Sequence, residues 1–217
     1  MSSTYHEIKT FLDARKVQLI AVSKTRPIAQ LMPLYEAGQR DFGENRVQEM
    51  REKHELMPAD IRWHLIGHLQ RNKVKYIAPW VHMIHSVDSA DLLKEIDRQA
   101  VTCNRVIPCL LQIYVATEET KFGLDEPELM ALLSSEAFHA MHNIQICGLM
   151  GMATNTENQE QIRKEFATLH AIFERTKARF FAQDNNFKEL SMGMSSDYNI
   201  AVEQCSTMVR IGSLLFN

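Results

Sequence analysis

Short apolar segments alternate with longer amphipathic segments along the whole chain. The apolar segments predict eight strands, at 18–24, 40–44, 62–67, 82–87, 107–115, 144–151, 189–193 and 208–212. The amphipathic segments repeat apolar residues every three or four positions and predict helices at 4–14, 28–37, 46–56, 70–78, 89–101, 126–138, 157–181 and 197–205. Strands that alternate with helices at this spacing are typical of parallel β–α units.

Most of the predicted strands are continuously apolar, as expected when helices cover a parallel sheet. Eight such units favour a single (β/α)8 TIM barrel, although the chain is short for that fold. An open, doubly wound parallel sheet is the alternative. No linker or shift in composition divides the sequence, so we expect one domain over residues 1–217.

Composition excludes several classes of protein. The 217 residues carry a formal net charge of −3, and Lys and Arg are scattered, which argues against a nucleic-acid partner. No apolar run approaches the roughly 18 residues of a membrane span, and the N-terminal residues do not resemble a signal peptide, so we expect a cytoplasmic protein. The charged run at 49–55 has helical spacing with mixed charge and predicts a solvated helix face.

Cysteine and histidine spacing gives no sign of a metal centre. The four cysteines form no C-x-x-C pair, which indicates neither a zinc site nor a disulfide framework, and we interpret them as buried small hydrophobes. His64 and His68 are four residues apart, but on a strand this separates them by roughly 13 Å, too far to share one ion. We therefore expect no metal.

Chemistry in a TIM barrel sits at the C-terminal ends of the strands. The first predicted strand, within "LIAVSKTRP", ends on Lys24. A lysine buried at a barrel mouth can have its pKa lowered by desolvation, and its neutral amine can then form a Schiff base with an aldehyde. The alternative is a lysine that turns outward after the strand ends.

Two segments near the C-terminus are candidate phosphate sites. In the first, Ser195, Ser196 and Asp197 stand where a helix should begin, which leaves backbone N–H groups for an anion. In the second, Gly212 permits close approach of the backbone and Ser213 adds a hydroxyl. The loops after the seventh and eighth strands are the frequent phosphate position in such barrels. Ordinary helix capping and a terminal turn are the alternatives.

Arg210 lies inside the last predicted strand, where a charge is costly unless something accepts its hydrogen bonds. One acceptor is a core carboxylate in a salt bridge. Another is a pyridine nitrogen, to which an arginine donates without giving up its proton, so that the ring stays unprotonated and is a poor electron sink.

An ordered set of motifs spans nearly the whole chain and carries a family resemblance. The segments are "AVSKTRP" (21–27), "FGENRVQE" (42–49), "WHLIGHLQRNK" (63–73), "IHSVDS" (84–89), "ETKFGL" (119–124), "GLMGM" (148–152), "LSMGMSSD" (190–197) and "STMVRIGSLLF" (206–216). The chain resembles the pyridoxal phosphate homeostasis protein family, whose fold is similar to the N-terminal barrel of alanine racemase and of eukaryotic ornithine decarboxylases.

The resemblance implies a cofactor, pyridoxal 5'-phosphate (PLP), held as a Schiff base on Lys24. It implies that Arg210 faces the pyridine nitrogen and that Asn45 lies near the ring. The phosphate is implied to be held by Met194, Ser195, Gly212 and Ser213.

Two further residues have weaker assignments. Met150 of "GLMGM" is implied to pack against the ring face, with plain barrel core as the alternative, and Lys121 is a secondary amine or merely solvated. Where relatives usually have threonine this chain has Ser213, which keeps the hydroxyl.

The racemase and decarboxylases carry a C-terminal β-domain that completes their active site across a dimer, and this sequence has no counterpart to it. The resemblance therefore implies a monomeric carrier and regulator of PLP in vitamin B6 homeostasis, without robust catalysis of its own. PLP-dependent apo-enzymes are the expected recipients. A PLP-dependent amino-acid racemase or lyase is the first alternative, and a phosphosugar enzyme with an aldolase-type Lys24 amine is the second.

Overall fold

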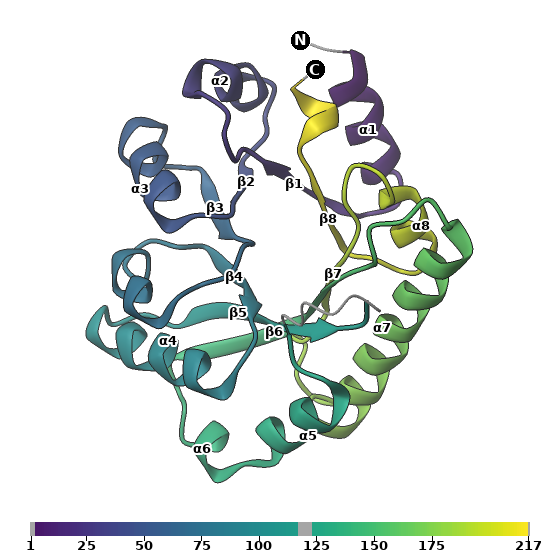
Figure 1. The fold of residues 1–217 in the computed structure, drawn as a ribbon. Coiled ribbons are helices and arrows are strands. Elements are labelled where there is room, and N and C mark those ends of the chain that lie inside the picture. Colours follow the sequence, from purple (N-terminus) through teal and green to yellow (C-terminus); the bar gives the residue numbers. More distant parts are fainter. Residues whose placement is uncertain (1–2, 117–122, 217) are drawn as a thin grey trace.

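Eight parallel strands close into a barrel, in which each strand pairs with the next along the chain and β8 pairs with β1 (Figure 1). This computed structural model describes residues 3–116 and 123–216. The strands are β1 (Gln18–Val22), β2 (Asp41–Glu44), β3 (Arg62–Leu65), β4 (Met83–Val87), β5 (Ile107–Tyr114), β6 (Ile144–Met152), β7 (Glu189–Ser191) and β8 (Met208–Ile211). The predicted TIM barrel is confirmed, and the open sheet is excluded.

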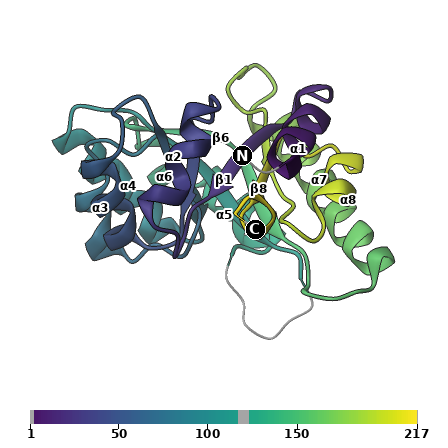
Figure 2. The same ribbon diagram turned by 90° about the horizontal axis from the view of Figure 1, so that it is seen from above.

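Helices surround the barrel on its outside, as the view turned by 90° also shows (Figure 2). They are α1 (Ser3–Asp13), α2 (Ile28–Glu36), α3 (Val47–Leu56), α4 (Ala90–Thr102), α5 (Glu126–Ser134), α6 (Glu136–His139), α7 (Gln159–Phe180) and α8 (Tyr198–Glu203), with 3-10 turns η1 (Arg71–Tyr76) and η2 (Ser213–Leu215). No helix within the described residues has the length and apolarity needed to cross a bilayer.

Two predicted helices differ from the structure. The segment at 70–78 forms only the 3-10 turn η1, and the segment at 126–138 is broken at Ser135. The Ser135 hydroxyl donates to the carbonyl of Leu132 at 2.7 Å and accepts from the N–H of Phe138 at 3.2 Å. One serine thus ends α5 and caps α6, because a hydroxyl near the backbone competes with helical hydrogen bonds.

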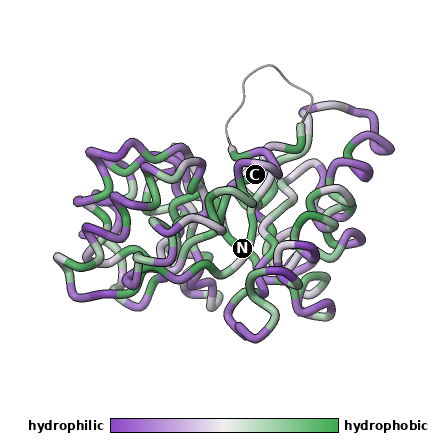
Figure 3. The backbone as a smooth tube through the Cα atoms, turned by 90° about the horizontal axis from the view of Figure 1, so that it is seen from below, coloured by the Kyte–Doolittle hydropathy of each residue, from purple (hydrophilic) through white to green (hydrophobic). Residues whose placement is uncertain are grey.

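Each strand presents alternate residues to the barrel interior and to the surrounding helices. Residues on the outward side pack with the helices in one large core, and in Figure 3 the hydrophobic colour gathers at the strands while hydrophilic segments lie on the outer helices. A second, separate set of buried residues forms the inner cluster: Met83, Leu110, Cys147, Met150 and Met208. The inner cluster is apolar, and the buried polar side chains of the interior, such as His64, His85 and Arg210, are separate from it, although β4 and β8 contribute to both.

The four cysteines do not share one environment. Cys109 and Cys147 are buried on β5 and β6, Cys103 is half-buried, and Cys205 is exposed. Burial raises the pKa of Cys147 to about 11. The expectation of four buried cysteines is wrong for Cys205, which follows α8 with a φ of 66° at the point where the helix ends.

A β-bulge lies in the wall between β5 and β6. The register runs from Cys109 opposite Ile146 to Leu110 opposite Gly148, so Cys147 is the extra residue. Gly148 has a φ of 152°, and a Cβ atom there would lie 1.8 Å from the carbonyl oxygen of Glu189. The backbones of β6 and β7 can therefore come this close together only if residue 148 is glycine.

We expect Gly148→Ala to lower the free energy of unfolding by about 3 kcal/mol or more, because the methyl group meets backbone that cannot move aside. Gly38→Ala is the matched control: Gly38 also has a positive φ, of 95°, but has nothing within 4 Å of the added atom. That control should cost about 1 kcal/mol. Urea denaturation measures both, and equal losses would contradict the argument.

Candidate cofactor site

The C-terminal ends of β1 and β8 lie side by side because these two strands close the barrel. Ile20 pairs with Arg210 and Ala21 with Ile211. Beyond the pairing, Gly212 stays close to β1, since a Cβ atom on it would lie 3.2 Å from the carbonyl oxygen of Val22. The residues that follow these strands, Lys24 and Ser213, therefore emerge at the same edge of the barrel.

Lys24 lies on a turn beyond β1, and its side chain is exposed. The predicted strand at 18–24 ends early, at Val22, so the expectation of a lysine buried at a strand end is wrong. The next residue, Thr25, has a φ of 61°, which turns the chain sharply. Solvent access removes the cost of burying the ammonium, so Lys24 follows the alternative of a lysine that turns outward after the strand.

The buried ammonium of Lys53 holds the turn that carries Lys24. Lys53 of α3 donates to the carbonyl of Ser23 at 2.6 Å, to Glu44 at 2.6 Å and to Glu49 at 2.7 Å. Ser23 also donates its hydroxyl to Glu44, and the N–H of Thr25 donates to Glu49, both at 2.6 Å. We call these five residues the Lys53 clamp. The prediction of a solvated face at 49–55 is wrong for Lys53, whose ammonium is buried by three acceptors.

Glu44, at the end of β2, has one satisfied carboxylate oxygen and one that is not. Among the buried side-chain oxygen and nitrogen atoms of the described residues, Glu44 Oε2 is the one without a hydrogen-bond partner. Burial raises the pKa of Glu44, against the lowering effect of Lys53 and Ser23. A hydrogen-bond donor from a bound group would satisfy it.

The two predicted phosphate segments touch each other. The N–H of Gly212 donates to the hydroxyl of Ser195 at 3.3 Å. Ser195 is half-buried and Ser213 is exposed, and the N–H groups of Ser195 and Ser196 have no acceptor among the described residues. The two segments are thus in direct contact through Gly212 and Ser195.

Met194 and Asp197 depart from the expected arrangement. The N–H of Met194 donates to the Asp197 carboxylate at 2.5 Å, so this amide is already occupied. The N–H of Asp197 donates in turn to the carbonyl of Met194 at 3.2 Å. The expectation of a free amide at Asp197 is therefore wrong: the residue is the N-cap of α8, but its own N–H is occupied by the turn with Met194.

Arg210 is buried inside the barrel without an ion-pair partner among the described residues. Its Nη1 donates to the hydroxyl of Ser191 at 2.6 Å and its Nη2 to the carbonyl of Gly151 at 2.9 Å. Burial lowers the pKa of Arg210 to about 10, and the charge of Asp197 offsets part of this effect. The salt bridge considered from the sequence is not found in the described chain.

Asn45 follows β2, the strand beside β1. It is half-buried and lines a hollow of about 390 Å³ together with Arg46, Lys73 and Tyr76. The backbone at Gly67 lies against it, because a Cβ atom there would come within 2.5 Å of the Asn45 carbonyl oxygen. Asn45 is thus one strand away from the edge that carries Lys24.

The two weaker assignments have different outcomes. Met150 is fully buried in the inner cluster, which is the barrel-core alternative considered for it. Lys121 lies outside the described residues.

Inside the barrel, Asp41, His64 and His82 bring their polar atoms within 4.8 Å of one another, a distance that would suit a metal ion. Arg62, however, donates to both oxygens of Asp41, at 2.7 and 2.6 Å. A guanidinium that already neutralises and fills the carboxylate opposes a divalent cation there. Sequence reasoning missed this group, because its members come from separate strands.

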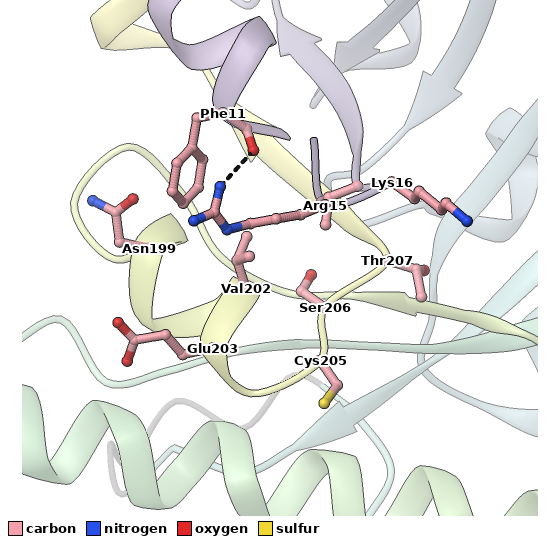
Figure 4. A pocket seen from close by; sticks show the side chains of 10 residues that line it. Phe11, Arg15, Lys16, Asn199, Val202, Glu203, Cys205, Ser206 and Thr207 are labelled. Carbon is pink, nitrogen blue, oxygen red and sulfur yellow. Dashed lines mark hydrogen bonds between the residues drawn. The ribbon is translucent and has the colours of Figure 1, made fainter. Parts of the chain in front are cut away.

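A larger hollow, of about 760 Å³, opens at the opposite end of the barrel (Figure 4). It lies between the end of α1 and the segment after α8, and Arg15 spans its wall with its guanidinium 4.0 Å from the centre of the Phe11 ring. The hollow is at the N-terminal ends of β1 and β8 and contains none of the predicted site residues. Its position argues against a role in the chemistry of the barrel.

Comparison with known proteins agrees with this arrangement. The family model described as "Alanine racemase, N-terminal domain" matches residues 1–217. The pyridoxal phosphate homeostasis protein of Aquifex aeolicus (strain VF5) is 38% identical over 200 residues, which cover 92% of this chain and 86% of the relative.

Two solved structures are also similar, both of PipY from Synechococcus elongatus PCC7942. The structure without PLP is 36% identical, with a TM-score of 0.91, and covers 99% of this chain and 98% of that one. The structure with PLP bound is 35% identical, with a TM-score of 0.84, and covers 97% of this chain and 99% of that one. The chain therefore belongs to the alanine racemase N-terminal domain family and, within it, to the pyridoxal phosphate homeostasis proteins.

Proposed function

We propose that this protein binds PLP as a Schiff base on Lys24 and acts in vitamin B6 homeostasis as a cytoplasmic, monomeric carrier and regulator, without robust catalysis of its own. PLP carries an aldehyde, a phosphate and a pyridine nitrogen, and each needs a different protein group. The relatives named pyridoxal phosphate homeostasis proteins and the PLP bound in the PipY structure support this choice of ligand.

The register of β1 against β8 is the observation that carries the proposal. It brings the turn that carries the exposed Lys24 to the same end of the barrel as Ser213, which follows Gly212, while Ser195 contacts Gly212 and Arg210 lies buried in β8. These groups match the aldehyde, the phosphate and the ring nitrogen of PLP. The close approach of Gly212 to β1 keeps the backbone out of the space between them.

Lys24 supplies the amine for covalent attachment. Its amine would hold the coenzyme by condensing with an aldehyde, with loss of water. Solvent exposure lets the coenzyme reach this amine without opening the barrel. The Lys53 clamp fixes the turn, which lowers the entropy that binding must remove.

The phosphate is held by hydroxyl and amide donors from the two contacting segments. Ser195 and Ser213 offer hydroxyls, and the N–H groups of Ser195 and Ser196 are free to donate. Because Asp197 occupies the amide of Met194, Met194 contributes contact and not a free N–H group.

Arg210 determines what chemistry bound PLP can support. PLP serves as an electron sink when its ring nitrogen is protonated, and an arginine cannot supply that proton. A donor that stabilises the unprotonated ring holds the coenzyme without activating it strongly. This supports a carrier over a racemase or lyase.

We expect Lys24→Ala to abolish the visible absorption band that forms when PLP is added to the protein, because the amine that bonds to the aldehyde is lost. Borohydride reduction and peptide mapping of the unmodified protein should place the label on Lys24. Lys188→Ala, at an exposed lysine before β7, is the matched control and should keep the band. A label spread over surface lysines, or no band, would sink the proposal and favour the phosphosugar alternative.

We expect the double variant Ser195→Ala, Ser213→Ala to weaken PLP binding about 10-fold or more, since each hydroxyl donates to a charged group. Pyridoxal, which lacks the phosphate, should bind the variant and the unmodified protein equally. Titration of the visible band with the two ligands measures both affinities. A parallel loss for pyridoxal would show that the hydroxyls do not hold the phosphate.

The protein loaded with PLP should not racemise or cleave free amino acids at a rate that competes with its release of PLP to an apo-enzyme. Chiral chromatography of an amino-acid mixture, beside reactivation of a PLP-depleted transaminase, compares the two. Rapid turnover without reactivation would favour the racemase or lyase alternative.

A further inference from the structure

A continuous series of buried hydrogen bonds leads from Arg210 across the barrel interior to Asp41. The Arg210 guanidinium donates to Ser191 Oγ at 2.6 Å, and Ser191 Oγ lies 3.0 Å from His85 Nδ1. His85 Nε2 lies 2.9 Å from His64 Nδ1, and His64 Nε2 lies 3.0 Å from Asp41 Oδ1. We call these five residues the relay. They come from β8, β7, β4, β3 and β2, and none is more than 6% exposed.

The two ends of the relay fix the direction of every bond in it. Arg210 can only donate. Asp41 can only accept: although burial alone would raise its pKa, hydrogen bonds from His64 and Arg62 hold that pKa well below its usual range. His64 must therefore carry its proton on Nε2, and its bare Nδ1 must accept from His85.

The same counting determines the tautomer of His85 and the orientation of Ser191. His85 donates from Nε2, so its Nδ1 is bare and accepts the hydroxyl proton of Ser191. The oxygen of Ser191 remains free to accept from Arg210. Each member then donates once toward Asp41, and both histidines are neutral.

The reverse direction leaves a buried group unsatisfied. If His64 were a cation that donated to His85, then His85 would donate from Nδ1 to Ser191. Arg210 would donate to the same oxygen, and the Ser191 hydroxyl would have no acceptor among the described residues. Ser191 is completely buried, so water cannot supply the missing acceptor, and this direction is disfavoured. Burial also lowers the pKa of His85 well below its usual value, together with the nearby His64 and Arg210.

Arg210 needs this support because no described carboxylate pairs with it. A buried guanidinium with two of its five N–H donors engaged can rotate or withdraw unless those two bonds are held in place. Ser191 is held by His85, and His85 by His64, which is anchored on the ion pair of Asp41 with Arg62. The negative charge of Asp41, at the end of the relay, also polarises each hydrogen bond of the series, including the one that Arg210 donates.

We propose that Ser191, His85 and His64 are positioning residues, which aim the guanidinium of Arg210 at the pyridine nitrogen of PLP and make Asp41 part of cofactor recognition. This inference rests on the proposed function. It means that the strength of PLP binding at the barrel mouth depends on an ion pair at the first residues of β2 and β3, at the opposite end.

The first test measures PLP affinity. We expect Ser191→Ala, which removes little volume, to weaken PLP binding about 10-fold, and His64→Leu, which does not touch Arg210, to weaken it about 3-fold. Thr176→Val is the matched control: its hydroxyl is buried in α7 and donates to the carbonyl of Ile172 at 2.8 Å, so it loses a buried bond without touching the relay. The control should bind PLP as the unmodified protein does.

The second test observes the protons directly, by nitrogen NMR of the histidine side chains in the full chain. Without PLP, His64 and His85 should both show a protonated Nε2 and a bare Nδ1. Addition of PLP should move the signals of both rings, while His54, which stacks on Trp80 with ring centres 3.9 Å apart outside the barrel, should not move.

The outcomes separate the two proposals. If PLP fails to attach to Lys24 in the unmodified protein, the proposed function falls, and the tautomers of the ligand-free protein still decide the direction of the relay. If PLP attaches but Ser191→Ala and His64→Leu bind it as tightly as Thr176→Val does, the positioning role is overturned and the proposed function stands. A protonated Nδ1 on His64 or His85 overturns the relay itself.

Discussion

The hydrogen-bonded pairing of β1 with β8 is the constraint on which the rest of the molecule depends. It joins segments from opposite ends of the chain, and no local preference of the sequence could bring them together. Once Ile20 faces Arg210, β1 and β8 end at the same edge of the barrel, and the segments that carry Lys24 and Ser213 both start from that edge. A shift of one residue in this pairing would turn Arg210 out of the barrel toward the helices.

Buried charge is the second constraint, and the fold meets it in the same way in two places. Lys53 and Arg210 are both cations removed from solvent, and each is satisfied by groups that come from other elements. The Lys53 clamp uses carboxylates, which hold the turn of Lys24 firmly. Arg210 is instead held by neutral groups, the hydroxyl of Ser191 and the carbonyl of Gly151, and its other N–H groups have no acceptor among the described residues.

The eight strands could be predicted because a strand of a parallel barrel is apolar on both faces and therefore conspicuous in the sequence. The predictions that failed concerned side chains at the ends of the strands and in the barrel interior. Burial of Lys24 was expected from the length of an apolar run, but the strand ends where the backbone turns, and that turn is set by Lys53 on a helix whose charged sequence suggests only solvent.

The polar interior was missed for a related reason. His64 stands between two outward-facing apolar neighbours, Trp63 and Leu65, so it is a single polar residue in an apolar segment, whereas His85 on the next strand is followed by the polar Ser86. That alternation was a usable signal of inward-facing polar residues. Their partners, however, lie on other strands, and only the register identifies them. The resemblance to a family named the candidate cofactor residues, but it gave no sign of what holds them.

The cysteines in the barrel wall differ in their access to solvent, and this difference makes opening of the barrel measurable. Cys109 and Cys147 lie on β5 and β6, which share the most extended pairing in the barrel, and burial raises the pKa of both thiols, whereas Cys205 is exposed beyond α8. An alkylating reagent that attacks thiolates meets Cys205 in the folded protein, but reaches Cys109 only when the wall opens. The rate of alkylation at Cys109 therefore reports how often the barrel wall opens. This rate can be measured without changing any group that would hold the coenzyme.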